Sequence, residues 1–260
     1  MSITVDNITR YLEELAPLSL AEQWDNVGLI VGDKNTVVNK VLITLDISWD
    51  TVHEAIDKNI DLIISHHPPI FGKLNKITTD CPTTGKAIAL IKNNISVYSA
   101  HTNLDKANGG LSDMLVNRLG LSHVTNLCED LGRIGELETE MSLMDFAKQV
   151  GHRLDLGVVR YVGDPNVVIK RVAVLSGSGA EHNYFISAKQ SNCDVYVTGD
   201  LKHHDAQEAL EMGLSIIDAT HYATENIVVE ELCNYLSERF KNIEIIQTST
   251  ENKFIKEVCV

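Results

Sequence analysis

Histidine and carboxylate side chains gather in four short segments of this 260-residue chain. Six of the ten histidines occur in the segments SHHPPIF (65–71), SAHTNLD (99–105), TGDLKHHD (198–205) and DATHYATE (218–225). Each segment directly follows an apolar run of strand length. Imidazole and carboxylate together form a ligand set that Zn, Mn, Fe, Co and Ni accept in proteins. Their concentration at four strand ends therefore predicts a metal site.

His66 and His67 stand side by side, which constrains how they can bind metal. Adjacent residues of an extended strand point to opposite faces, so an ideal strand does not offer both to one ion. They can instead serve two ions that lie side by side across the strand end. Pro68 biases His67 toward an extended backbone, and Pro69 continues the constraint. We therefore expect the prolines to hold the imidazoles apart, one per metal.

Two His-x-x-x-carboxylate spacings strengthen this prediction. They join His101 to Asp105 and His221 to Glu225, each after a strand-like run. A histidine pair is weak evidence by itself, and so is a single spacing of this kind, but the three together favour a two-metal site. Two ions about 3.5–4 Å apart need a bridging group, for which Asp105 and Glu225 are the candidates. The alternative for Glu225 is purely structural, because a carboxylate also stabilises a helix start.

Alternating strand-like and helical patterns must position these side chains. Apolar runs of strand length cover 40–46, 61–65, 95–100, 171–177, 194–199 and 214–219. Helical patterns cover 49–59, 84–94, 110–120, 180–192, 205–213 and 225–240. Such alternation predicts an α/β fold with parallel or mixed sheets, in which ligands gather outside the carboxyl ends of the strands. The strand-like runs that reach Leu45 and Leu175 are followed by no histidine.

The remaining segments complete this pattern. The span 121–170 contains a strand-like stretch at 132–137 and a strand and turn at 157–165. A helix is expected to start at Ser142, with Asp145 as its capping-box partner. A last strand over 243–250 is expected to return to the first half of the chain.

The two halves of the chain resemble each other in sequence. NIDLIIS (59–65) resembles NCDVYVT (192–198), and the two His-x-x-x-carboxylate segments correspond in order. Two similar α/β lobes are therefore expected, one of residues 1–125 plus 226–260 and one of residues 126–225, with a metal cleft between them at the strand ends. The alternative is the general likeness of any two α/β halves.

Composition excludes several classes of function. The net charge of −14 repels phosphate backbones, so general nucleic-acid binding is not expected. Five scattered cysteines without a C-x-x-C motif indicate reduced thiols in a cytoplasmic protein. The first residues do not resemble a signal or transit peptide, and no apolar run is long enough to cross a bilayer. We therefore expect a cytoplasmic protein that does not act at a membrane.

The sequence resembles the Nif-three-like family of dinuclear metal-centre proteins, also named GTP cyclohydrolase 1 type 2 homologues. The matching motifs span nearly the whole chain in order: AEQWDNVGLIVG, SHHPPIF, AHTNLD, GRIGEL, LSGSGAEH, VTGDLKHHDAQEA and HYATE. The resemblance implies two divalent ions (Zn, Fe, Mn, Co or Ni) and a ring-shaped homohexamer. The metal ligands it implies are His66, His67, Asp105, His221 and Glu225.

The resemblance also implies finer roles. Glu225 is the expected bridge between the ions, and His101 is a further ligand or a hydrogen-bonding partner of one. Some family members carry an inserted domain in mid-chain, for which this chain is too short.

Two weaker candidates lie in the second half. The SGSG segment (176–179) follows a strand, so the amides of Gly177 and Gly179 are candidates to bind an anion, although a plain tight turn explains the sequence equally well. His203 and His204 are candidates for substrate binding or proton relay, or for no role at all.

These observations lead to two hypotheses about function. The first is a metal-dependent hydrolase that acts on a nucleotide-like substrate such as GTP, with no catalytic group assigned beyond a metal-bound water. The second is a non-enzymatic metal-handling or regulatory scaffold protein that forms a ring. Turnover that disappears in Glu225→Ala supports the first, and unchanged background rates support the second.

Overall fold

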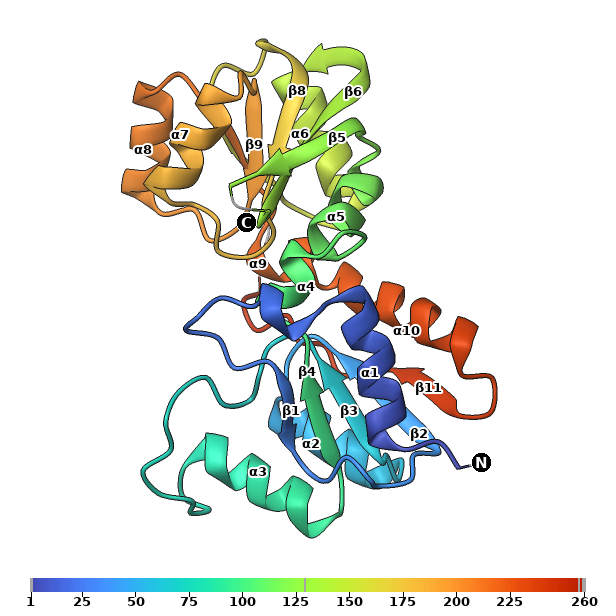
Figure 1. The fold of residues 1–260 in the computed structure, drawn as a ribbon. Coiled ribbons are helices and arrows are strands. Elements are labelled where there is room, and N and C mark those ends of the chain that lie inside the picture. The colour runs from blue at the N-terminus through green and yellow to red at the C-terminus, as the bar shows by residue number, and fades with distance from the viewer. Residues whose placement is uncertain (1, 129, 257, 259–260) are drawn as a thin grey trace. The chain divides into compact units, whose positions relative to one another are not determined.

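The computed structural model describes residues 2–128, 130–256 and 258, which form two compact α/β units (Figure 1). The first unit extends to Leu104 and resumes over Val228–Phe254. The second comprises Asp105–Ile227, joined by the C-terminal end from Ile255. Each unit has its own mixed sheet, of five and six strands respectively, so the predicted fold class is confirmed.

The sheet of the first unit has the strand order β1-β4-β3-β2-β11. Its members are β1 (Gly28–Val31), β2 (Lys40–Thr44), β3 (Leu62–Ser65), β4 (Ser96–Ser99) and β11 (Glu244–Gln247). Strand β1 runs antiparallel to β4, and the other pairs are parallel. Strand β11 pairs with β2 as expected for the returning C-terminal strand, whereas β1 was not expected from the sequence.

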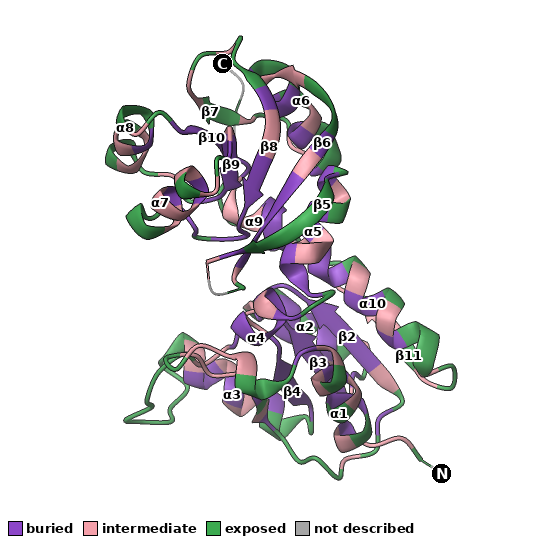
Figure 2. Cartoon of the chain, turned by 45° about the horizontal axis from the view of Figure 1, so that its top comes forward, coloured by how far each residue is buried: buried purple, intermediate pink, exposed green. Residues whose placement is uncertain are grey.

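Helices cover both faces of this sheet. Leu42, Ile63 and Val97 share a core with Val52 of α2 (Trp49–Asp57) and Leu90 of α3 (Pro82–Lys92). The helices α1 (Val5–Leu15) and α10 (Ile227–Arg239) lie side by side, and their tyrosine rings Tyr11 and Tyr235 stack with centroids 4.6 Å apart. Figure 1 shows α1 in front of the sheet and α2 behind it. Every residue of β3 and β4 is consequently buried (Figure 2).

The sheet of the second unit has the order β5-β6-β8-β9-β10-β7. Its members are β5 (Ser122–Leu127), β6 (Gly132–Ser142), β7 (Arg160–Val162), β8 (Val168–Val174), β9 (Val195–Thr198) and β10 (Ser215–Asp218). Strands β8, β9 and β10 are parallel, and the other pairings are antiparallel. Strand β6 extends past the expected 132–137, and β5 was not expected because only its last residue is buried.

Four helices pack on this second sheet. They are α5 (Leu111–Leu119), α6 (Leu143–Arg153), α7 (His182–Gln190) and α8 (His203–Glu211). Phe185 of α7 and Ala209 of α8 share a core with Tyr196 of β9. The predicted cap of α6 is confirmed, because the Ser142 hydroxyl accepts a hydrogen bond from the Asp145 amide at 3.1 Å. Gly120 ends α5 in the left-handed conformation, as expected for a C-terminal glycine.

The two units repeat one strand arrangement. In the first, β2, α2, β3, α3 and β4 form successive parallel crossovers, and β1 pairs antiparallel beside β4. In the second, β8, α7, β9, α8 and β10 do the same, and β7 pairs antiparallel beside β10. A five-residue helix follows the last parallel strand in each case: α4 (Thr102–Lys106) after β4 and α9 (His221–Glu225) after β10. The two His-x-x-x-carboxylate segments therefore occupy equivalent positions.

The structure describes four of the five cysteines. Within the described residues no disulfide joins Cys81, Cys128, Cys193 or Cys233, and Cys259 lies outside them. None of the described helices is both long enough and apolar enough to span a membrane.

Candidate metal centre

Three imidazoles converge at one edge of the first unit's sheet. His66 and His67 follow the end of β3, and His101 lies two residues past the end of β4. Because Ser65 and Ser99 pair at the ends of these parallel strands, the segments that follow leave the sheet together. One ring nitrogen from each histidine lies within 4.8 Å of the other two, and the ring centroids are 5.0–5.3 Å apart. The three side chains can therefore hold a metal ion.

The Nδ1 atom of each imidazole contacts an acceptor oxygen. For His66 the partner is the Ala100 carbonyl at 2.8 Å, for His67 the Asp46 carboxylate at 2.9 Å, and for His101 the Asp25 carboxylate at 3.0 Å.

A carbonyl or carboxylate oxygen can only accept, so in each ring Nδ1 carries the hydrogen and the lone pair of the neutral imidazole lies on Nε2. Metal-binding histidines are typically held in this way, with one nitrogen on a carboxylate or carbonyl and the other on the metal.

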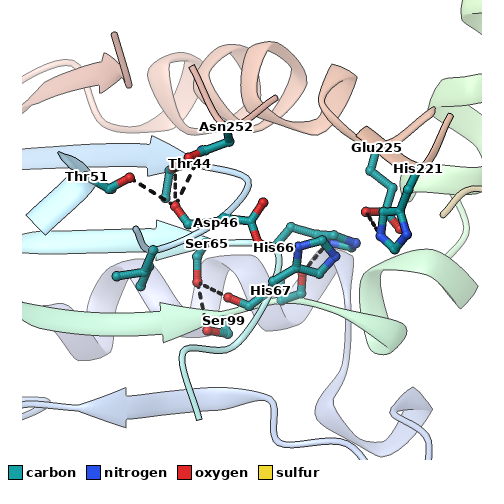
Figure 3. A network of polar contacts seen from close by, with 12 residues as sticks. Thr44, Asp46, Thr51, Ser65, His66, His67, Ser99, His221, Glu225 and Asn252 are labelled. Atoms are coloured by element: carbon teal, nitrogen blue, oxygen red, sulfur yellow. Dashed lines mark hydrogen bonds and ion pairs between the residues drawn. The ribbon is translucent and has the colours of Figure 1, made fainter. Parts of the chain in front are cut away.

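A polar network holds the His67 side of this cluster (Figure 3). The Ser65 hydroxyl donates to the His67 carbonyl at 2.8 Å and lies 2.9 Å from the Ser99 hydroxyl. The hydroxyls of Thr44 and Thr51 both donate to the Asp46 carbonyl, at 2.9 and 3.2 Å. Both the histidine and its carboxylate partner are thus positioned by buried backbone. Such positioning lowers the entropy lost when a metal orders its ligands.

Asp25 holds the His101 side. Its carboxylate accepts from the Thr102 amide at 3.1 Å, the Thr102 hydroxyl at 2.6 Å and the Asn26 amide at 2.7 Å, besides His101. Burial by itself would raise the pKa of Asp25, but these hydrogen bonds and the nearby imidazole outweigh it and lower the pKa to about 2. Asp25 is therefore ionised at neutral pH and orients His101.

The second unit carries its own imidazole and carboxylate on α9. Nε2 of His221 lies 2.9 Å from Oε2 of Glu225, one helical turn later, and Nδ1 lies 2.8 Å from Oδ2 of Asp200 (Figure 3 shows the first contact). The Nδ1 partner is again a carboxylate. Burial would lower the pKa of His221, but Glu225 and Asp200 outweigh it and raise the pKa to about 9. The imidazole of His221 thus has a carboxylate oxygen at each of its two nitrogens.

Tight backbone packing positions α9. Thr220, which precedes the helix, has φ 63° and ψ 149°, a region that β-branched residues rarely occupy. Its hydroxyl accepts from the Ala223 amide at 3.2 Å and so caps the helix. A Cβ atom on Gly177 would lie 2.1 Å from Oε1 of Glu225, and one on Gly199 would lie 2.4 Å from the His221 amide nitrogen. Glycine at these two strand ends makes room for the ligand helix.

Asp105 is the fourth residue of α4, the helix that starts directly after His101. It is buried, with 9% of its surface exposed. Its role as a metal ligand stays a prediction.

The weaker candidates are His203, His204 and the glycines of the 176–179 segment. His203 and His204 begin α8 and are exposed, with ring centroids 5.3 Å apart, and they belong to no group of potential metal ligands among the described residues. The amides of Gly177 and Gly179 donate to the hydroxyls of Thr224 and Thr198 at 2.9 and 3.1 Å. Both amides are thus engaged inside the protein, which favours the tight turn over the anion site.

Three carboxylates of this centre had no role in the sequence-based prediction. Asp25 and Asp200 lie in quoted motifs, and Asp46 follows the strand-like run that reaches Leu45. That strand end was set aside because no histidine follows it. A search for any carboxylate at a strand end would have included Asp46.

Comparison with known proteins places the chain among close relatives. The model of the family Duf34/NIF3 (NGG1p interacting factor 3) matches residues 3–253. A Clostridium acetobutylicum protein named GTP cyclohydrolase 1 type 2 homolog is 40% identical over 233 residues, which is 86% of each chain. A Clostridium perfringens protein of the same name is 37% identical over 93% of this chain and 95% of its own.

Two solved structures have a similar fold over nearly the whole chain. A Staphylococcus aureus hypothetical protein superimposes with a TM-score of 0.93 at 30% identity, covering 99% of this chain and 100% of its own. A Bacillus cereus protein related to NIF3 gives a TM-score of 0.92 at 26% identity, with 99% of each chain covered.

Proposed function

Because the chain belongs to the Duf34/NIF3 family, we propose that the side-chain clusters of its two units bind two divalent metal ions and that the protein is a hydrolase. The proposed ligands are His66, His67, His101, Asp105, His221 and Glu225, with Glu225 as the bridge. The observation that carries the proposal is the common state of four imidazoles, each of which has Nδ1 against a carbonyl or carboxylate oxygen. Histidines that only fill space or contact solvent do not require this shared arrangement.

The donor set fits a divalent transition metal. It contains only nitrogen and oxygen atoms, which suits Zn, Mn, Fe, Co and Ni. When bound, two such ions polarise the bond under attack and favour deprotonation of a water molecule near neutral pH. The protein's own part is to hold its imidazoles through Nδ1, for which the carboxylates of Asp25, Asp46 and Asp200 are responsible. The names of the curated relatives support a nucleotide such as GTP as the substrate class.

Two further features belong to this proposal. The exposed His203 and His204 are candidates to bind substrate or relay a proton. A homo-oligomer, a hexamer by resemblance, is the proposed assembly in the cytoplasm, and light scattering of the purified protein measures its mass.

The experiment compares metal content and turnover in three proteins. Wild type, Glu225→Gln and Glu238→Gln are purified identically, and their metal is measured by elemental analysis. Glu238 is a matched control because it is exposed on α10. We expect about two ions per chain in the wild type and in the control, and fewer in Glu225→Gln.

Turnover is then measured against GTP and simple phosphoesters. We expect turnover that Glu225→Gln abolishes and Glu238→Gln retains. About two ions per chain without turnover would favour the non-enzymatic metal-handling alternative. A wild type that binds at most one ion would contradict the dinuclear centre.

A further inference from the structure

Two large aromatic side chains stand exposed beside the histidine cluster of the first unit. Trp24 is 61% exposed and Phe71 is 52% exposed. Both contact the ring of His101 in T-shaped geometry, with centroids 5.9 Å away for Trp24 and 5.7 Å for Phe71. The chain is only 5% aromatic and has two tryptophans. Exposure of two large aromatic rings at one functional imidazole is unfavourable in water, which points to a binding role.

The two aromatic residues lie on segments that the protein holds in place. Trp24 is followed by Asp25, whose carboxylate makes the hydrogen bonds to His101 and Thr102 described above. Asn26 donates from Nδ2 to the carbonyl of Ile70, the residue before Phe71, at 2.7 Å. The segment that carries Trp24 is thus joined both to His101 and to the segment that carries Phe71. A ligand that contacts both rings loses little entropy in ordering them.

We propose that Trp24 and Phe71 form an aromatic rim that binds a planar heteroaromatic ring of the ligand beside His101. The inference rests on the proposed function, since it names the chemical class that the metal centre acts on. A base or similar ring has two π faces and stacks on any aromatic side chain, with little dependence on its substituents. Neither aromatic ring is stacked on His101, because both contacts are T-shaped.

Tryptophan fluorescence measures this binding directly. Trp49 is the other tryptophan, so Trp49→Phe leaves Trp24 as the single reporter. The metal-loaded variant is excited at the red edge of the indole band and titrated with GMP, CMP and ribose 5-phosphate. We expect saturable quenching by GMP and CMP and no response to ribose 5-phosphate.

Variants test the rim by calorimetry with GMP in a wild-type background. We expect Trp24→Ala and Phe71→Ala each to weaken binding about 5- to 150-fold, because a base stacked on an aromatic ring contributes about that factor. Trp24→Phe should restore most of the affinity. Phe254→Ala is the matched control, because Phe254 is 66% exposed and has no contact with the histidine cluster among the described ring pairs.

The outcomes separate this inference from the metal proposal. Equal affinity for GMP and ribose 5-phosphate, or an unchanged affinity in Trp24→Ala, overturns the rim. The rim is also overturned if Trp24→Ala and Phe71→Ala change the particle mass but not the affinity for GMP. That result would make these residues an interface between copies of the chain. If the wild type binds GMP through its base but takes up no metal and shows no turnover, the rim is supported and the proposed hydrolase is contradicted. If Trp24→Ala and Phe71→Ala keep both their affinity for GMP and normal turnover, the rim is contradicted and the proposed hydrolase is supported.

Discussion

Glu54 offers a quantitative test of how the C-terminal segment is attached to the first unit. Its side chain, on α2, is 7% exposed. The carboxylate accepts from Lys58 Nζ at 2.6 Å, from the Ser249 amide and hydroxyl at 2.8 and 2.7 Å, and from the hydroxyls of Thr248 and Thr250 at 2.5 and 2.9 Å. Glu54→Gln keeps the volume but replaces one acceptor oxygen with a donor that faces other donors. We expect this change to destabilise the protein.

The magnitude follows from the pKa of Glu54. Burial would raise this pKa, but the contacts with Lys58, Thr248 and Ser249 outweigh it and lower the pKa from 4.5 to about 2. A lowering of this size corresponds to about 3 kcal/mol of stabilisation by the ionised carboxylate. Because the folded pKa is the lower one, the stabilisation is complete above pH 4.5 and is lost as the pH falls toward 2. We therefore expect Glu54→Gln to lose about 2–3 kcal/mol at pH 7, and the difference from wild type to shrink below pH 4.5.

The assay is urea-induced unfolding at several pH values, with hydrogen exchange of the Ser249 amide as a local probe. Glu238→Gln is the control, since Glu238 is exposed on α10. Ser249 should lose protection in Glu54→Gln alone. A free-energy difference that is the same at pH 7 and pH 3, or a Ser249 amide that stays protected, would refute the assignment of the stabilisation to the ionised carboxylate.

Hydrogen bonds connect the C-terminal segment to the proposed metal centre, so Glu54→Gln also tests that connection. Asn252, three residues after Ser249, is buried and donates from Nδ2 to the Thr44 hydroxyl at 2.9 Å. That hydroxyl donates to the carbonyl of Asp46, the partner of His67 (Figure 3). Loosening of this segment should weaken metal binding, though less than direct removal of the Asp46 carboxylate.

Three further predictions concern the metal centre itself. Asp46→Asn should weaken metal binding about 10- to 100-fold with the fold intact by circular dichroism, and unchanged affinity in a metal titration would contradict the orienting role. Gly177→Ala places a Cβ against Glu225 and should abolish metal binding at α9. Gly213→Ala has a similar φ, and its Cβ would meet only the flexible Lys189 Nζ at 3.8 Å, so it should only lower stability. Equal metal content in the two variants would exclude the steric argument. Thr220→Ala removes the helix cap and should lower the free energy of unfolding by about 1 kcal/mol. Thr220→Gly removes the same cap but relieves backbone strain, so it should be the more stable of the two variants in thermal unfolding. The reverse order would contradict the strain at this position.

Local sequence patterns determined most of the secondary structure of this protein. The parallel strands and the helices between them were predicted because buried strands are continuous apolar runs and helices have a 3.6-residue period. Strand β5 was missed because it is mostly exposed and lacks such a run. The expected helix 225–240 corresponds to α10 (Ile227–Arg239), and the structure adds the short helix α9 before it. The start of α9 is capped by Thr220, whose positive φ no periodicity records.

The sequence by itself also singled out the histidines as candidate metal ligands, because their types and spacings at strand ends are local properties. Tertiary structure alone decided which carboxylate lies against the Nδ1 atom of His67, His101 and His221. Asp25 lies 76 residues from His101, and Asp46 and Asp200 each lie 21 residues from their histidines. Asp46 and Asp200 meet their histidines because neighbouring parallel strands end at one edge of a sheet. Asp25 meets His101 because β1 begins, antiparallel, beside the end of β4. Strand order and register are set by packing of the whole sheet, which sequence spacing does not contain.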